Sequence, residues 1–180
     1  MTPEEHTALG AAYEAQGKAE LARAEYEAAL AAGESAGPLL GLGNLAVAEG
    51  QPEAAEGYFR RALRHDPDSA LIRNNLAWTL LLQGKALEEA EVLAREALAR
   101  DGRLAPYIRD TLALLAKRRG DLAGARAELE SALAAAPEGD VPLRRQLYGH
   151  LAAILSEAGE AEAAAAVERA AALLAPPGGP

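Results

Sequence analysis

The sequence predicts an all-α protein built from five consecutive helix pairs, and three observations support this. Glycines recur at intervals of 33, 34, 36 and 39 residues, each at the end of a helix-like stretch: Gly17, Gly50, Gly84, Gly120 and Gly159. A period of this length is typical of repeat proteins. Half of the 180 residues are hydrophobic but only 4% are aromatic, and alanine alone accounts for 46. This composition favours closely packed helices over a thick sheet core.

The third observation is that small residues recur in register with these glycines. A leucine followed by a small residue precedes each glycine, at Leu9, Leu42, Leu76, Leu112 and Leu151. Two alanines seven residues apart follow it, at Ala22 and Ala29, Ala55 and Ala62, Ala90 and Ala97, Ala125 and Ala132, and Ala164 and Ala171. Two helices joined by a short turn cross closely only where side chains are small, so these columns mark the crossing points.

The first two pairs carry the clearest signals. Residues 8–30 read ALGAAYEAQGKAELARAEYEAAL, with Tyr26 between the two alanine columns. In the second pair Pro52 suits a first helical turn, where its missing N–H costs nothing. Phe59 takes the place of Tyr26, and Pro67 ends the second helix. The run Gly41-Leu-Gly43-Asn44 belongs to a helix crossing, since no Lys-Ser or Lys-Thr follows it as a phosphate loop requires.

The remaining pairs depart slightly from this pattern. The third has one extra residue near Lys85–Leu87, and the fifth follows extra residues at 138–142. The fourth ends at Pro137, as the second ends at Pro67. The predicted helix pairs are 3–16 with 18–32, 38–49 with 52–64, 70–83 with 86–100, 106–119 with 121–135, and 142–158 with 160–174. A loose tail is expected at 176–180, where prolines and glycines stop the last helix.

The recurring glycines, leucines and alanines resemble the pattern of the tetratricopeptide repeat family over nearly the whole chain. The resemblance implies a right-handed α-solenoid of about five helix-turn-helix pairs. The five repeats would span residues 3–35, 36–69, 70–105, 106–139 and 142–175 of one superhelix. The family's members act as interaction scaffolds, so the resemblance implies a non-enzymatic protein that binds another protein.

Composition excludes several other classes of function. The net charge is −9, which disfavours nucleic-acid binding and docking on anionic membranes. The chain has no cysteine, and its three histidines lie in different repeats without metal-ligand spacing, so we expect no metal, cofactor or catalytic site. No signal sequence or membrane span is visible, which favours a cytoplasmic protein. Fifteen arginines against three lysines suggest a bacterial source.

The resemblance also predicts where a partner binds. In this family the first helix of each pair lines a concave groove that holds a peptide of the partner. Transferred to this chain, the central groove residues are Asn44, Asn74, Asn75, Trp78, Asp110, Leu114 and Lys117. Asparagine can donate and accept hydrogen bonds with a peptide's amides, and Trp78 is the only tryptophan, a residue type that dominates many interfaces.

The alternative hypothesis is self-association. Repeat arrays usually finish with a polar capping helix. Here the last predicted helix instead carries apolar residues that nothing further would cover: Val167, Ala170, Leu173 and Leu174. That face could pair with a second copy in a homodimer. The partner protein itself is not identified by the sequence.

Overall fold

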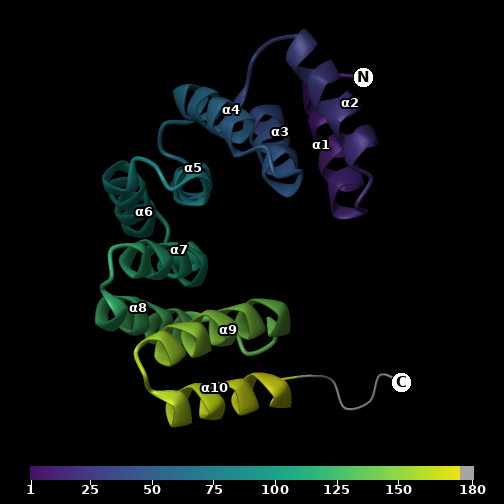
Figure 1. Cartoon of the computed structure of the whole chain (residues 1–180). Coiled ribbons are helices and arrows are strands. Elements are labelled where there is room, and N and C mark those ends of the chain that lie inside the picture. The colour runs from purple at the N-terminus through teal and green to yellow at the C-terminus, as the bar shows by residue number, and fades with distance from the viewer. Residues whose placement is uncertain (175–180) are drawn as a thin grey trace. The chain divides into compact units, whose positions relative to one another are not determined.

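The computed structural model describes residues 1–174, and this part of the chain is helical without strands (Figure 1). Every predicted helix is present, and its ends lie within two residues of the predicted ones. The α-helices are α1 (Pro3–Ala15), α2 (Ala19–Ala31), α3 (Ala36–Ala48), α4 (Pro52–His65), α5 (Ala70–Gln83), α6 (Leu87–Arg100), α7 (Ala105–Arg118), α8 (Leu122–Ala135), α9 (Val141–Glu157) and α10 (Ala161–Leu173). The tail predicted at 176–180 lies outside the described residues.

One short element was not anticipated from the sequence. A 3-10 turn, η1 (Gly102–Leu104), precedes α7. The side chain of Asp101 accepts a hydrogen bond from the backbone N–H of Arg103 at 3.0 Å, which stabilises this turn. The turn occupies the position where the other repeats lead to a proline or a serine cap.

The chain divides into two compact units, of which the first is Met1–Arg100 and the second begins at Asp101. The N-terminal unit holds α1 to α6, and the C-terminal unit holds η1 and α7 to α10. Within each unit consecutive helices pack side by side (Figure 1). That the five repeats form a single superhelix remains a prediction.

The periodic glycines close the first helix of each pair, as their spacing predicted. Gly17, Gly50, Gly84, Gly120 and Gly159 have φ between 65° and 81°, the left-handed region that costs glycine least. Four helix starts, those of α1, α5, α8 and α9, also have a side-chain cap. At α1 the Thr2 side chain and the Glu5 side chain cap each other's backbone N–H groups, an arrangement that stabilises a first helical turn.

The small-residue columns lie at the helix crossings. Nine of the ten column alanines are buried; Ala171, on the last described helix, is half-buried. The large residues between the columns fill the adjacent space: Tyr26, Phe59 and Leu129 are at most 2% exposed. Burial of such side chains supplies most of the driving force for helix packing.

Candidate functional site

A pocket of about 310 Å³ opens in the N-terminal unit between α3, α4 and α5. Its lining comprises Asn44, Val47 and Ala48 of α3, Phe59 of α4, and Asn75 and Trp78 of α5. No charged side chain lines it. An apolar hollow with a few polar groups at its edge is the usual form of a binding site.

Asn44 and Asn75 are directly bonded at this pocket. The Nδ2 of Asn75 donates to the Oδ1 of Asn44 at 3.0 Å. Within the described residues, the Nδ2 of Asn44 and the Oδ1 of Asn75 have no other partner. The pair therefore retains one hydrogen-bond donor group and one acceptor group, and a peptide group likewise has one of each.

Helical geometry places these side chains together. Asn44, Val47 and Ala48 lie at spacings of three and four residues, and Asn75 and Trp78 are three apart, so each set shares one helix face. Phe59 reaches the pocket floor because Gly43 has no side chain. A Cβ at Gly43 would lie 2.4 Å from a Phe59 ring carbon, closer than any packed pair of carbons.

Asn74 is positioned differently from its neighbour Asn75. It does not line the pocket, and its Oδ1 is buried without a hydrogen-bond partner. A buried oxygen outside the pocket is not accessible to a ligand bound there, so this side chain is a poor choice for a ligand contact.

Of the three groove residues predicted in the C-terminal unit, Asp110 and Lys117 have partners of their own. Asp110 is only 3% exposed; its Oδ2 accepts from Gln146 Nε2 at 2.8 Å, and its Oδ1 lies 2.6 Å from His150 Nδ1. Asp110 therefore ties α7 to α9. Lys117 Nζ lies 3.0 Å from a carboxylate oxygen of Glu157, and Leu114 is half-buried.

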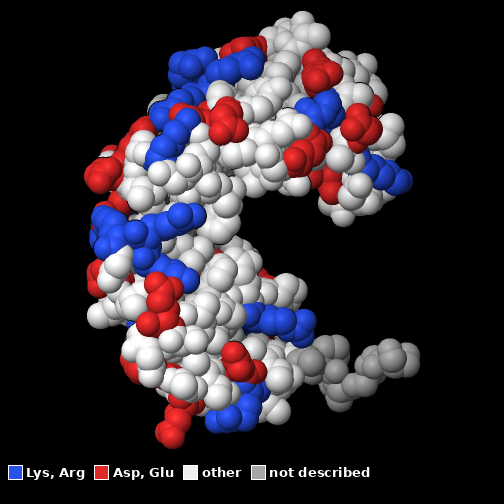
Figure 2. Space-filling view, in the orientation of Figure 1, with Lys and Arg blue, Asp and Glu red and all other residues white. Residues whose placement is uncertain are grey.

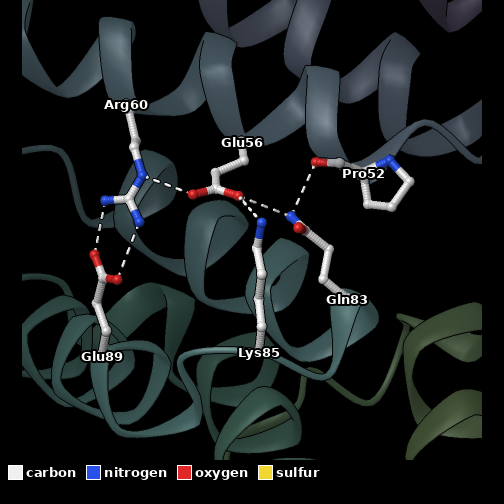
Figure 3. Close-up of polar contacts among 6 residues, drawn as sticks. All are labelled: Pro52, Glu56, Arg60, Gln83, Lys85 and Glu89. Atoms are coloured by element: carbon white, nitrogen blue, oxygen red, sulfur yellow. Dashed lines mark hydrogen bonds and ion pairs between the residues drawn. The ribbon is translucent and has the colours of Figure 1, made fainter.

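A charged cluster on α4, α5 and α6 is the densest polar network in the N-terminal unit (Figure 3). Glu56 accepts from Arg60, Gln83 and Lys85 at 2.9, 3.0 and 2.9 Å. Arg60 also forms a two-point contact with Glu89 at 2.7 and 3.0 Å. Burial alone would raise the pKa of Glu56, but hydrogen bonds from Lys85, Arg60 and Gln83 together lower it to about 2. Because each charge has its counter-charge, the cluster serves packing rather than ligand binding.

The described residues contain no group of three or more His, Asp or Glu side chains placed to hold a metal ion. They also contain no helix long and apolar enough to cross a membrane. Figure 2 shows Lys and Arg side chains interspersed with Asp and Glu over the face in view. The basic run at 60–65 follows this pattern, since both Arg61 and His65 contact Glu34.

Comparison with known proteins identifies the repeat. Residues 40–106 match a family model described as "Tetratricopeptide repeat", and this segment contains the whole of the pocket between α3, α4 and α5. This segment is similar to tetratricopeptide repeats. A search of curated proteins found no match.

Solved structures share the fold of this chain at low sequence identity. Protein pilF of Pseudomonas aeruginosa is 22% identical, with a TM-score of 0.78 over 98% of this chain and 78% of its own. TTC0263, a thermophilic tetratricopeptide repeat protein of Thermus thermophilus, is 20% identical, with a TM-score of 0.79 over 98% of this chain and 93% of its own. The Cut9-Hcn1 hetero-tetramer of the APC/C contributes a chain that is 17% identical, with a TM-score of 0.85 over 97% of this chain but only 33% of that one.

Sequence reasoning did not single out Ala48 or Phe59 as pocket residues, and it did not predict the partner of Asp110. Ala48 was detectable, since it lies four residues after Asn44 on the same helix face. Phe59 was assigned to packing alone, and only the tertiary structure shows its ring at the pocket floor. His150 was assigned to a surface or packing role, and no local pattern pairs it with Asp110, forty residues earlier.

Proposed function

We propose that this chain, like tetratricopeptide repeat proteins generally, is a protein-interaction scaffold without enzymatic activity. We propose that this chain binds an extended peptide segment of a partner protein, and that the segment docks at the pocket between α3, α4 and α5. The observation that carries the proposal is the Asn44–Asn75 pair beside Trp78. Its spare donor and acceptor suit one backbone amide of the peptide, and the apolar hollow suits the adjacent side chain.

The proposed site contains fewer of the groove residues than the sequence predicts. Asn44, Asn75 and Trp78 remain as ligand contacts, together with Val47 and Ala48. Asn74, Asp110 and Lys117 are left out, because their side chains are buried or already paired. Leu114 is left out because it does not line the pocket between α3, α4 and α5.

The test combines a pull-down with site-specific cross-linking in lysate of the source organism. A photo-reactive residue at Ala48, which is exposed at the pocket, should capture a partner through one contiguous peptide. The same residue at Ala54, exposed on α4 away from the pocket, is the matched control. An Asn75→Ala, Trp78→Ala variant should lose the partner. Retention by this variant, or equal capture from Ala54, would place binding elsewhere.

Self-association through α10 is the second candidate, favoured by one observation. Leu173 is 86% exposed, whereas Val167 packs against the core of the C-terminal unit, and Ala170 and Leu174 are half-buried. Leu173 is therefore the residue that a second copy would cover. Light scattering of wild type and a Leu173→Glu variant tests this: a dimer lost in the variant supports it, and a wild-type mass of one chain at high concentration contradicts it.

A further inference from the structure

The first helices of the three pairs in the N-terminal unit carry three glutamates, all on α1, and a single arginine, on α5. α3 has no charged residue, and α1 has Glu4, Glu5 and Glu14 but no Lys or Arg. The only arginine on α5 is Arg73, whose side chain is 11% exposed and whose Nε lies 3.1 Å from Glu96. His6 on α1 is likewise engaged, with Nδ1 2.6 Å from Glu25.

The positive charge of this unit lies on the other helices and is largely neutralised there. Residues 1–100 contain nine Lys and Arg against sixteen Asp and Glu. Arg23 pairs with Glu49, Arg60 with Glu56 and Glu89, and Arg61 with Glu34. An approaching segment therefore meets a negative field.

This distribution decides which residues a bound segment can carry. The pocket lining is uncharged, so a carboxylate placed there would be desolvated with no counter-charge, at a large cost. The residue that enters the pocket must be apolar. Flanking acidic residues would be repelled by the surrounding carboxylates, whereas flanking basic residues would be attracted.

We propose that the partner segment is cationic, with an apolar anchor residue flanked by Lys or Arg; this rests on the peptide-binding function proposed above. A second hollow in the same unit supports it. This hollow, of about 420 Å³, lies between α1 and the start of α3, and Glu4 is the only charged residue in its lining: Pro3, Glu4, Thr7, Ala8, Ala11, Ser35, Gly37 and Pro38.

The two hollows share α3, which sets their separation. Pro38 lines the second hollow and Val47 the first, and nine residues of α-helix extend about 13 Å. An extended chain covers that length in about four residues. A Lys or Arg at least about four residues from the apolar anchor would therefore reach the hollow beside Glu4.

The experiment is a selection of phage-displayed random 12-residue peptides on the immobilised full chain, with parallel selection on the Asn75→Ala, Trp78→Ala variant. Peptides enriched on wild type alone should carry net positive charge and an apolar anchor. If the peptides enriched on wild type alone are neutral or acidic, the cationic proposal is wrong, but the proposal of peptide binding at the pocket stands. No enrichment of wild type over the variant overturns both.

A matched pair of variants then tests the charge directly. Ala48 lines the pocket and is the last residue of α3, where a cation is compatible with the helix dipole. Ala48→Lys should weaken binding of a synthetic selected peptide by at least about tenfold at low salt, and Ala48→Gln by less than about threefold. The tenfold effect of Ala48→Lys should become smaller as the salt concentration is raised. Equal affinities for the two variants would contradict the proposal.

Discussion

At the scale of single residues, the missing side chains of glycines determine how closely helices approach. Tyr26 lies between the backbones of α1 and α3. A Cβ at Gly41 would lie 2.2 Å from its ring, and one at Gly10 would lie 2.7 Å away. The hydroxyl of Tyr26 donates to Glu14 at 2.6 Å, so the ring cannot easily move aside. Gly41 is therefore required by packing rather than by its backbone conformation.

We expect Gly41→Ala to lower the free energy of unfolding by about 1–3 kcal/mol, because the new methyl group overpacks the Tyr26 site. Gly57→Ala is the matched control: Gly57 lies inside α4, and a Cβ there meets nothing within 4 Å. That change should raise stability by up to about 1 kcal/mol, since alanine is the better helix former. Urea unfolding measures both, and a Gly41→Ala variant as stable as wild type would contradict the packing argument.

Asp110 illustrates a second role at this scale, that of a buried polar link. Asp110→Ala would leave Gln146 and His150 without their acceptor, at a cost of about 2–3 kcal/mol in the C-terminal unit. Glu168→Ala, at an exposed α10 residue, should change stability by less than about 0.5 kcal/mol. Hydrogen exchange of α7 and α9 amides reports the difference, and unchanged protection would show that Asp110 is dispensable.

At the scale of helices, Glu56 of α4 contacts Gln83 of α5 and Lys85 of the turn before α6. It also accepts from Arg60, which pairs with Glu89 of α6. Its pKa is about 2 in the folded protein, against 4.5 for the free side chain. A carboxyl with a lowered folded pKa stabilises the protein above its unfolded pKa. That stabilisation is lost as the pH falls from about 4.5 toward about 2. We therefore expect acid to loosen the contact among these three helices.

Glu56→Gln should lower the free energy of unfolding by about 2 kcal/mol at pH 7. It should also remove part of the decline that wild type shows between pH 4.5 and 2. Glu27→Gln, an exposed α2 residue with no ion pair in the described residues, serves as control and should follow wild type. Urea unfolding across this pH range is the measurement. Parallel pH curves for Glu56→Gln and wild type would mean that Glu56 carries no net stabilisation.

At the scale of the whole molecule, the two compact units differ in the number of repeats. The N-terminal unit holds three helix pairs and the C-terminal unit two. A repeat buries its apolar face only against its neighbours, so about three are needed for independent stability. The N-terminal unit meets that number and contains the proposed binding pocket.

We predict that a fragment of residues 1–100 folds alone, with a cooperative urea transition and the helical circular dichroism expected for α1 to α6. A fragment of residues 101–180 should be markedly less stable, because two pairs bury less apolar surface. A non-cooperative 1–100 fragment would show instead that the first unit depends on the second.

How much the sequence could predict differs between fold and site. The ends of the first helices follow from local signals, because the five periodic glycines adopt left-handed conformations. The crossings follow from the column alanines, of which nine of ten are buried. The amides of Asn44 and Asn75 were also identifiable, since helix register places them on first helices. Whether such a side chain is available to a ligand depends on neighbours distant in the chain. Asn75 lines the pocket, whereas the Oδ1 of Asn74 is buried, and Asp110 pairs with His150.

The sequence by itself therefore determined the all-α class, the five repeats and the helix boundaries, since turn conformation and close helix crossing depend on residue type and spacing. Only the tertiary structure decided where a hollow remains once the side chains are packed, and which polar groups stay unpaired. Those outcomes arise from contacts between helices about thirty to forty residues apart, such as Asn44 with Asn75 and Asp110 with His150. No local pattern encodes them, because each depends on the sizes of several neighbouring side chains at once.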